Sequence, residues 1–315
     1  KALVICALFF NDETVLHTAL KVFKAECKEE ILPDGMHFEL SPMYHKLIFE
    51  GVIRVAVALK DRGLDDHEVD GYLRPMLDAA WSLEEGLDRI PLFNDAGNNV
   101  AKSLQALVSA CKRHFDITPE YKSRFVDSGI YIFKQNDWKL IVDAGQPGPA
   151  YIPGHAHCDA MSFELFKAGK PVIVNCGTYA YQCKERSFFR STAAHNTVMV
   201  NDTEQSQCWG AFRMAKRSKV NVVSVSENSI VIELIDQCGQ AVKRTIQLEK
   251  TMKVTDESSG NKLTAFVHLI REINMTFEGD AKTTGQQYAP EYGELVSLEA
   301  VKYEGNGKIS VEICI

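Results

Sequence analysis

The sequence predicts an α+β protein in which a helical part, residues 1–125, is followed by an antiparallel β part, residues 126–315. Apolar residues recur every three or four positions in the first part and every second position in the second part. The 315 residues are also enough for two ordinary domains. Because the strand patterns follow one another with no helical pattern between them, the β part is predicted to be an antiparallel sandwich.

The helical part contains an apolar opening stretch, KALVICALFF, and four further helical patterns. The stripe from Val15 to Ile31 predicts a helix that Asp12 caps and that Pro33-Asp34-Gly35 ends. The next two helices are predicted around residues 47–59 and 73–81, and the last one in NNVAKSLQALVSACKRHF.

The β part opens with a hairpin signal, GIYIFKQNDWKLIVDAG, whose two β-rich runs are joined by Gln135-Asn136-Asp137. Alternating patterns continue to the end of the chain, in KPVIVNCG, HNTVMVND, SKVNVVSVSENSIVIELID, KRTIQLEK and YEGNGKISVEICI.

Composition excludes some classes of protein. The formal net charge of −7 argues against a nucleic-acid-binding protein, which is more often basic. The opening apolar stretch is too short to span a bilayer and lacks a signal-peptide cleavage pattern, so no membrane span is expected. The chain starts at Lys1 rather than Met, and we expect its targeting information to lie elsewhere. Nine cysteines without a CxxC pair indicate free thiols and favour a reducing compartment.

Two histidines stand out in GHAHCDAMSFELF, residues 154–166. If this run is the edge of a strand, His155 and His157 point to the same face. Asp159 and Glu164 follow closely. Histidine is both a common buried residue and the commonest metal ligand and acid/base group, so the pair alone leaves a structural and a functional interpretation open.

A second candidate stretch is DGMHFELSPMYHKLIFE, residues 34–50. Tyr44 and His45 follow Ser41-Pro42 at the start of a predicted helix, so both are expected to project from a loop–helix junction. The alternative is that Ser41 is an ordinary helix cap and Tyr44 a surface residue.

A third candidate is the loop within residues 174–200, between two predicted strands. Its arginines could grip a carboxylate or sulfate with a fixed fork of donors, which suits an acidic substrate. A surface loop with solvated charges is the alternative. The candidate residues are Asn175, Tyr179, Tyr181, Arg186, Arg190 and His195.

The run from GPAYIPGHAHCDAMSFEL through GTYAY and RSTAAHNTV to EQSQCWGAFR resembles the heparinase II/III-like family of polysaccharide lyases, and so do DGMHFELSPMYH and IPLFNDAG. The resemblance covers nearly the whole chain. It implies an incomplete α/α toroid followed by a β-sandwich, with a cleft between them. It also implies cleavage of a uronic-acid-containing acidic polysaccharide by β-elimination.

Elimination removes the C5 proton of a uronate and expels the 4-linked oxygen, which requires a base and an acid. By resemblance, Tyr44 is the base, the acid or both, and His155 faces it across the cleft. His45, Tyr179, Tyr181, Arg186 and Arg190 are expected to contact the substrate.

The resemblance also implies one structural divalent metal, most plausibly zinc. His157 and His195 match metal ligands of several relatives, and Asn175 stands where the third ligand is commonly an aspartate. An amide oxygen brings no charge and should hold zinc more weakly. We expect His157 to turn towards His195 and Asn175, with Asp159 or Glu164 orienting a ligand.

Two departures from the family follow. Relatives carry a carboxylate-neutralising Asn on a helix before the segment that corresponds to KALVICALFF, and their toroid has more helices, so both are expected to lie outside this sequence. The family favours a periplasmic location, whereas the free cysteines favour the cytoplasm.

Two other functions stay open. The chain could bind or remodel glycan in surface-polysaccharide assembly without cleaving it, or it could be a carbohydrate-binding module. A binding module has no need of the acid and base represented by Tyr44 and His155, which counts against the last interpretation. The oligomeric state is not predicted.

Overall fold

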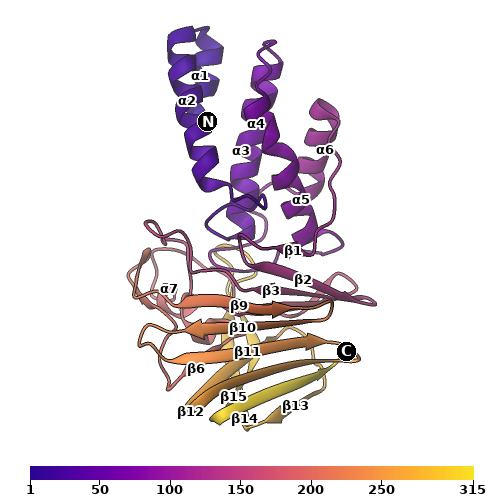
Figure 1. Ribbon diagram of the computed structural model, residues 1–315, viewed down its shortest axis with the longest axis vertical. Coiled ribbons are helices and arrows are strands. Elements are labelled where there is room, and N and C mark those ends of the chain that lie inside the picture. Colours follow the sequence, from indigo (N-terminus) through magenta and orange to yellow (C-terminus); the bar gives the residue numbers. More distant parts are fainter.

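The computed structural model describes all 315 residues and places the helices on one side of a large sheet (Figure 1). The last helix of the first part ends at Phe115, and the first strand begins at Arg124. Six helices form the first part: α1 (Ala2–Phe10), α2 (Glu13–Glu30), α3 (Pro42–Lys60), α4 (His67–Gly71), α5 (Leu73–Glu84) and α6 (Leu104–Phe115). Measured against the length and hydropathy that a bilayer-crossing helix needs, every one of them falls short.

The helices begin where their caps predict. Asp12 Oδ1 accepts the Val15 N–H at 2.9 Å and Ser41 Oγ accepts the Tyr44 N–H at 3.2 Å. Ser103 caps α6, so this helix starts later than the predicted pattern from Asn98. The short helix α4 was not predicted, because its five residues carry no apolar period.

The strands are β1 (Arg124–Phe125), β2 (Ile130–Gln135), β3 (Trp138–Asp143), β4 (Phe163–Lys167), β5 (Lys170–Ile173), β6 (Val198–Val200), β7 (Gln207–Trp209), β8 (Arg213–Ala215), β9 (Lys219–Val225), β10 (Ser229–Ile235), β11 (Ala241–Leu248), β12 (Thr251–Leu269), β13 (Met275–Glu278), β14 (Asp280–Tyr288) and β15 (Val296–Cys314). A short helix, α7 (Arg186–Phe189), lies between β5 and β6. The predicted antiparallel β part is therefore confirmed.

Thirteen of the strands form one sheet, in which β12 and β15 pair along most of their length. Side chains of β2, β3 and β4 pack in the same apolar cluster as side chains of β10, β11, β12 and β15. Two groups of strands thus cover one core. The sequence analysis missed β12, because charged and small polar residues such as Lys253, Asp256 and Ser258 interrupt its apolar pattern.

The connection between α5 and α6 joins the two parts of the protein. Its Asp95 N–H donates to the His155 carbonyl at 3.0 Å, and its Asn98 N–H donates to the Pro290 carbonyl at 3.1 Å. Asn98 also forms a parallel bridge with Glu291. A loop that belongs to the helical part by sequence is therefore anchored on the β part, where it supports the candidate site.

Candidate active site

Tyr44 lies in the first turn of α3, at the junction of the helical and β parts. Ser41 caps this helix and Pro42 occupies its first position, so the backbone direction at Tyr44 is well defined. The Tyr44 ring packs on the His155 imidazole, with ring centroids 4.1 Å apart and a tilt of 34°. The structure thus brings these two predicted residues into contact.

Tyr181, from the loop between β5 and β6, completes the contact. Its hydroxyl lies 2.6 Å from the Tyr44 hydroxyl, and its ring centroid is 5.7 Å from that of His155. Burial raises the pKa of Tyr44, and the hydrogen bond with Tyr181 partly offsets this rise. Burial also raises the pKa of Tyr181. Both hydroxyls therefore keep their protons at neutral pH.

His155 and His157 lie in a loop before β4, not on a strand as predicted. Side chains and carbonyls from other segments hold this loop: the His157 N–H donates to Asn94 Oδ1 at 3.1 Å, and the Cys158 N–H donates to the Arg190 carbonyl at 3.0 Å. Because this backbone is not a strand, side chains two residues apart need not point to the same face. The two imidazoles point in different directions.

His155 is the more accessible of the two, with 21% of its side chain exposed. Its Nδ1 lies 2.8 Å from Asp95 Oδ2. A carboxylate can only accept, so Nδ1 carries the proton and the lone pair of a neutral ring is at Nε2. The nearest charged group to Nε2 is Glu39, whose Oε1 is 3.9 Å away. His155 is therefore arranged to accept a proton at Nε2.

Asp95 is the centre of the polar network, and the sequence analysis did not select it. Its carboxylate is fully buried and contacts His155, His157, Thr178 and Arg186. Burial alone would raise the pKa of Asp95, but His157, His155 and the Arg186 guanidinium hold it well below its usual range. Asp95 is a permanent anion that orients the imidazoles. Its only sequence signal was its place in IPLFNDAG.

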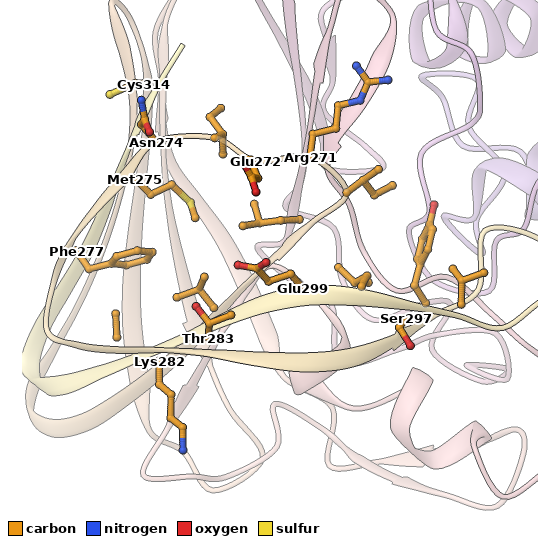
Figure 2. A pocket seen from close by; sticks show the side chains of 18 residues that line it. Arg271, Glu272, Asn274, Met275, Phe277, Lys282, Thr283, Ser297, Glu299 and Cys314 are labelled. Carbon is orange, nitrogen blue, oxygen red and sulfur yellow. The ribbon is translucent and has the colours of Figure 1, made fainter.

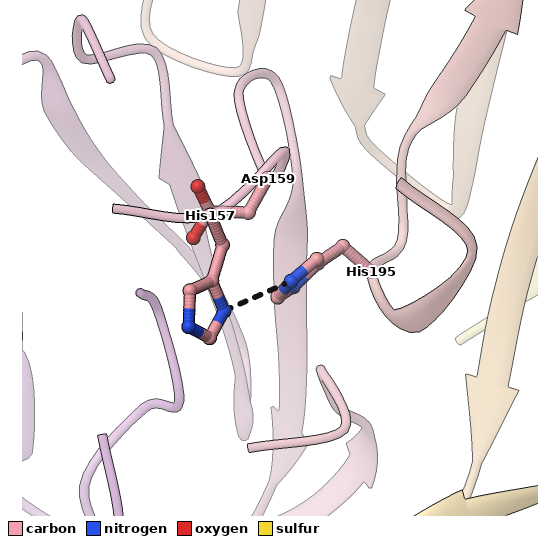
Figure 3. Close-up of side chains that lie close together, drawn as sticks. All are labelled: His157, Asp159 and His195. Atoms are coloured by element: carbon pink, nitrogen blue, oxygen red, sulfur yellow. Dashed lines mark hydrogen bonds between the residues drawn. The ribbon is translucent and has the colours of Figure 1, made fainter. Parts of the chain in front are cut away.

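His157 points away from Tyr44 and is completely buried. Its Nε2 lies 2.8 Å from Asp95 Oδ1, and its Nδ1 lies 3.2 Å from His195 Nε2 (Figure 3). Burial lowers the pKa of His157 to about 4, although Asp95 opposes the shift. The pKa of His195 is lowered as well, by burial and by neighbouring imidazoles. Both rings are neutral at physiological pH.

Asp159 is the acidic side chain that lies with these histidines. His157, Asp159 and His195 offer ligand atoms that all lie within 4.8 Å of one another, as Figure 3 illustrates. Burial raises the pKa of Asp159 to about 6. The structure therefore contains a buried His/Asp/His group of the kind that can hold a metal ion.

Asn175, the predicted third ligand, is engaged within the protein. Its Oδ1 accepts the Asn196 N–H at 3.0 Å, and its Nδ2 donates to Ser162 Oγ at 3.3 Å. Its own N–H donates to Glu164 Oε1 at 2.8 Å. The side chain ties three segments together.

The structure corrects two predicted substrate contacts. His45 is fully buried: its Nδ1 accepts the His37 N–H at 3.2 Å and its Nε2 lies 2.9 Å from the Met76 carbonyl. Neighbouring positions on a helix are about 100° apart, so His45 faces the core when Tyr44 faces outward. Arg190 is also buried and donates to the carbonyls of Ala156 and Arg213. Both are structural residues.

Arg186 and Tyr179 take intermediate places. Arg186 is buried, forms two hydrogen bonds with the Asp95 carboxylate and packs beneath the Tyr181 ring at 5.0 Å. It supports the site without a free fork for substrate. Tyr179 packs against the apolar cluster that contains Met43 and Phe189.

The hairpin β7–β8 contributes an unpredicted aromatic residue at its turn. Phe212 is 41% exposed, and its ring centroid lies 5.9 Å from His155 and 5.1 Å from Tyr181. Tyr292, 40% exposed, packs edge-on against Tyr181 at 5.1 Å. Exposed aromatic rings therefore border the Tyr44–His155 contact.

A large cavity lies elsewhere, in the β part (Figure 2). It has a volume of about 1070 Å³, and none of the polar residues described above lines it. Apolar side chains such as Met275 and Phe277 form much of its wall, with the carboxylates of Glu272 and Glu299. Its charged lining is balanced between Glu272, Glu299, Arg271 and Lys282, and it lies apart from Tyr44 and His155, so size alone does not mark this cavity as the active site.

Comparison with known proteins identifies the family of this chain. Residues 7–123 match the family described as heparinase II/III N-terminus, and residues 117–305 match heparinase II/III-like, C-terminal. A heparin-sulfate lyase from Pedobacter heparinus is 24% identical over 59% of this chain and 32% of its own length. A heparin-sulfate lyase from Bacteroides stercoris is 24% identical over 67% of this chain and 35% of its own length.

Solved structures show the same fold. A heparinase III structure superposes with a TM-score of 0.82 at 16% identity, over 99% of this chain and 58% of that chain. The structure of the heparan sulfate lyase HepC from Pedobacter heparinus superposes with a TM-score of 0.76 at 17% identity, over 99% of this chain and 58% of that chain. The matched part of this chain spans about a third of the length of the two curated relatives, and somewhat more than half of each solved chain. With both family matches together reaching from residue 7 to residue 305, this chain belongs to the heparinase II/III-like family.

Proposed function

We propose that the protein is a polysaccharide lyase that cleaves a uronate-containing glycosaminoglycan, of the heparan sulfate class, by β-elimination. The observation that carries the proposal is the group formed by Tyr44, His155 and Tyr181, in which Tyr44 lies against the imidazole and within 2.6 Å of the second hydroxyl. The relatives described as heparin-sulfate lyases support the substrate class.

His155 is the proposed base. Asp95 holds its Nδ1 proton, so the lone pair of this partly exposed ring is at Nε2 and can accept the C5 proton of the uronate. Asp95 also favours the imidazolium that forms, because its carboxylate is 2.8 Å away.

Tyr44 is the proposed acid. Burial raises its pKa, so its hydroxyl keeps its proton at neutral pH and can donate it to the departing 4-linked oxygen. The Tyr181 hydroxyl can then donate to the phenolate that remains. The bond from C4 to the oxygen breaks, and a C4–C5 double bond forms.

The bordering aromatic rings support binding of a sugar at this junction. Phe212 and Tyr292 are exposed and can pack on the apolar faces of sugar rings next to the reacting uronate. The six helices are inferred to be part of an incomplete α/α toroid and the strands to form the β-sandwich of the family.

A structural metal fits the His/Asp/His group. His157, Asp159 and His195 offer ligand atoms within 4.8 Å of one another, and the ring nitrogens His157 Nδ1 and His195 Nε2 are 3.2 Å apart. Two imidazoles and a carboxylate are a donor set that zinc accepts. Zinc held by His157, His195 and Asp159 would supply rigidity to the loop that carries His155.

The test is an assay of the full-length protein on separate uronate polymers: heparan sulfate, chondroitin sulfate, hyaluronan and alginate. We expect heparan sulfate to give the ultraviolet absorbance of an unsaturated uronate and shorter chains. Absorbance only with another polymer would overturn the substrate class. Binding without absorbance on any of them would overturn the lyase and support a glycan-binding protein of surface-polysaccharide assembly.

A further inference from the structure

We propose that Cys158 and Cys208 form a redox-active dithiol beside the candidate active site, and that a low-molecular-weight disulfide converts it into a protein disulfide. The two sulfur atoms are 3.8 Å apart. Cys158 follows His157 in the loop before β4, whereas Cys208 is the middle residue of β7. The proposal concerns a modification site and does not depend on the lyase activity.

The surroundings hold the two thiols near each other. The Cys158 N–H donates to the Arg190 carbonyl, and its thiol donates to the Ser206 carbonyl at 3.3 Å. Cys208 is fixed by the hairpin, in which it pairs with Met214. The S–S bond of a disulfide is about 2.05 Å long. The two sulfur atoms, now 3.8 Å apart, therefore need only a small side-chain movement to form it.

The two cysteines differ in access. Cys158 is buried, whereas Cys208 is partly exposed, next to the exposed Trp209. Cys208 is therefore the sulfur that an external disulfide can reach. The Cys158 S–H can turn from the Ser206 carbonyl to a Cys208 thiolate, and this hydrogen bond, followed by the nearby Arg190 guanidinium, lowers the pKa of Cys208.

The reaction is a pair of thiol–disulfide exchanges. The Cys208 thiolate attacks one sulfur of the small disulfide, forms a mixed disulfide and releases the first small thiol. The Cys158 sulfur, as it loses its proton, then attacks Cys208 and releases the second thiol. The protein loses two protons and two electrons, and the small disulfide gains them as it becomes two thiols.

The disulfide would attach the β7–β8 hairpin to the loop that carries His155. Phe212, at the turn of this hairpin, lies against His155 and Tyr181. Arg186 Nε already donates to the Ala211 carbonyl at 2.9 Å, and Arg190 donates to the Arg213 carbonyl at 3.1 Å. Oxidation would add a covalent connection where only hydrogen bonds and packing now hold the hairpin.

The experiment treats the folded full-length protein with reduced or oxidised glutathione, blocks free thiols with N-ethylmaleimide and maps the peptides by mass spectrometry. We expect oxidised glutathione to yield a linked peptide pair containing Cys158 and Cys208, which dithiothreitol separates. Closing a loop of this length should raise the melting temperature by about 5–10 °C, and amide exchange across residues 207–215 should slow.

Two variants control the assignment. Cys208→Ser should abolish both the linked peptide and the rise in melting temperature, whereas Cys238→Ser, at an exposed cysteine, should keep both. Three results would overturn the proposal: alkylation of both thiols after oxidation, glutathione retained on Cys208 as a stable mixed disulfide, or a linkage of either residue to a different cysteine. The mapping uses the unmodified sequence, so it stands even if a variant fails to fold.

Discussion

His155 and His157 are two residues apart and bind opposite oxygens of the same carboxylate. His155 contacts Asp95 Oδ2 and His157 contacts Asp95 Oδ1, each at 2.8 Å. Their exposures differ: 21% of the His155 side chain is accessible, and none of His157. His155 meets Tyr44, whereas His157 meets His195. The comparison teaches that access, rather than the hydrogen-bond partner, separates a group that can react from one that supports it.

The strongest test of the accessible side is Tyr44→Phe. The ring and its packing on His155 stay, while the hydroxyl is lost, so turnover should fall by a factor on the order of 10² or more with little change in melting temperature. The assay is initial-rate absorbance on heparan sulfate. Tyr121→Phe is the matched control. Tyr121 lies just before β1, under the Lys134 ammonium, and this variant should stay active. Near-normal turnover for Tyr44→Phe would show that another group donates the proton.

Asp95→Asn tests the carboxylate that both imidazoles contact. The amide can donate to one imidazole, which moves the proton of that ring to its other nitrogen, and it leaves Arg186 without its buried counter-charge. Turnover should fall by about 10²-fold and the melting temperature should fall with it. The Glu39 carboxylate is farther from His155, at 3.9 Å, so Glu39→Gln should have a smaller effect than Asp95→Asn. Unchanged turnover in Asp95→Asn would contradict its positioning role.

His195→Ala tests the buried side. It removes an imidazole that contacts His157 without reaching Tyr44, so stability should suffer more than chemistry, with a melting temperature lower by several degrees. Elemental analysis should find about one zinc per chain in the unaltered protein and none in the variant. Chelation should destabilise only the unaltered protein. If the unaltered protein contains no metal and the chelator does not change its melting temperature, His157 and His195 are a hydrogen-bonded pair instead.

Tyr181→Phe sharpens the account of the accessible side. The Tyr181 hydroxyl lowers the pKa of Tyr44, so its removal should raise that pKa. Turnover should fall by about tenfold, the scale of one hydrogen bond to a charged group, and the alkaline limb of the pH–rate profile should move to higher pH. If the alkaline limb does not move, the acid whose ionisation causes that limb is not Tyr44.

Glu164→Gln should have the smallest effect on turnover, and its effect appears in the pH dependence of stability. Burial raises the pKa of Glu164 from 4.5 to about 8, so the folded state keeps the proton that the unfolded state loses. The stability is complete below pH 4.5 and is lost as the pH rises to about 8, by at most about 1.4 kcal/mol per pH unit.

The difference in melting temperature between the unaltered protein and Glu164→Gln cancels the other titrating groups. It should change steadily in favour of the variant across this range. A constant difference would mean that Glu164 is ionised in the fold.

Periodicity predicted most helices and strands, because apolar patterns are local. Site geometry was harder to predict. The sequence places Tyr44 and His45 together, yet one helical step sends His45 into the core. Arg190 looked like a loop residue, but the hairpin β7–β8 packs over it. Asp95 was missed because its partners are about 60 to 90 positions away in the chain, and no pattern records such a contact.

The loop between α5 and α6 has a consequence for how this protein could be recombined. By sequence it precedes the change from helices to strands, yet its Asp95 and Asn98 are bonded to the β part. A chimera joined between Phe115 and Arg124 would pair the histidines of one parent with the aspartate of the other. The loop and the strands must therefore come from the same parent, and a crossover before the loop, at the end of α5, would carry α6 with them and require its Leu107 and Cys111 to fit the helical core of the other parent.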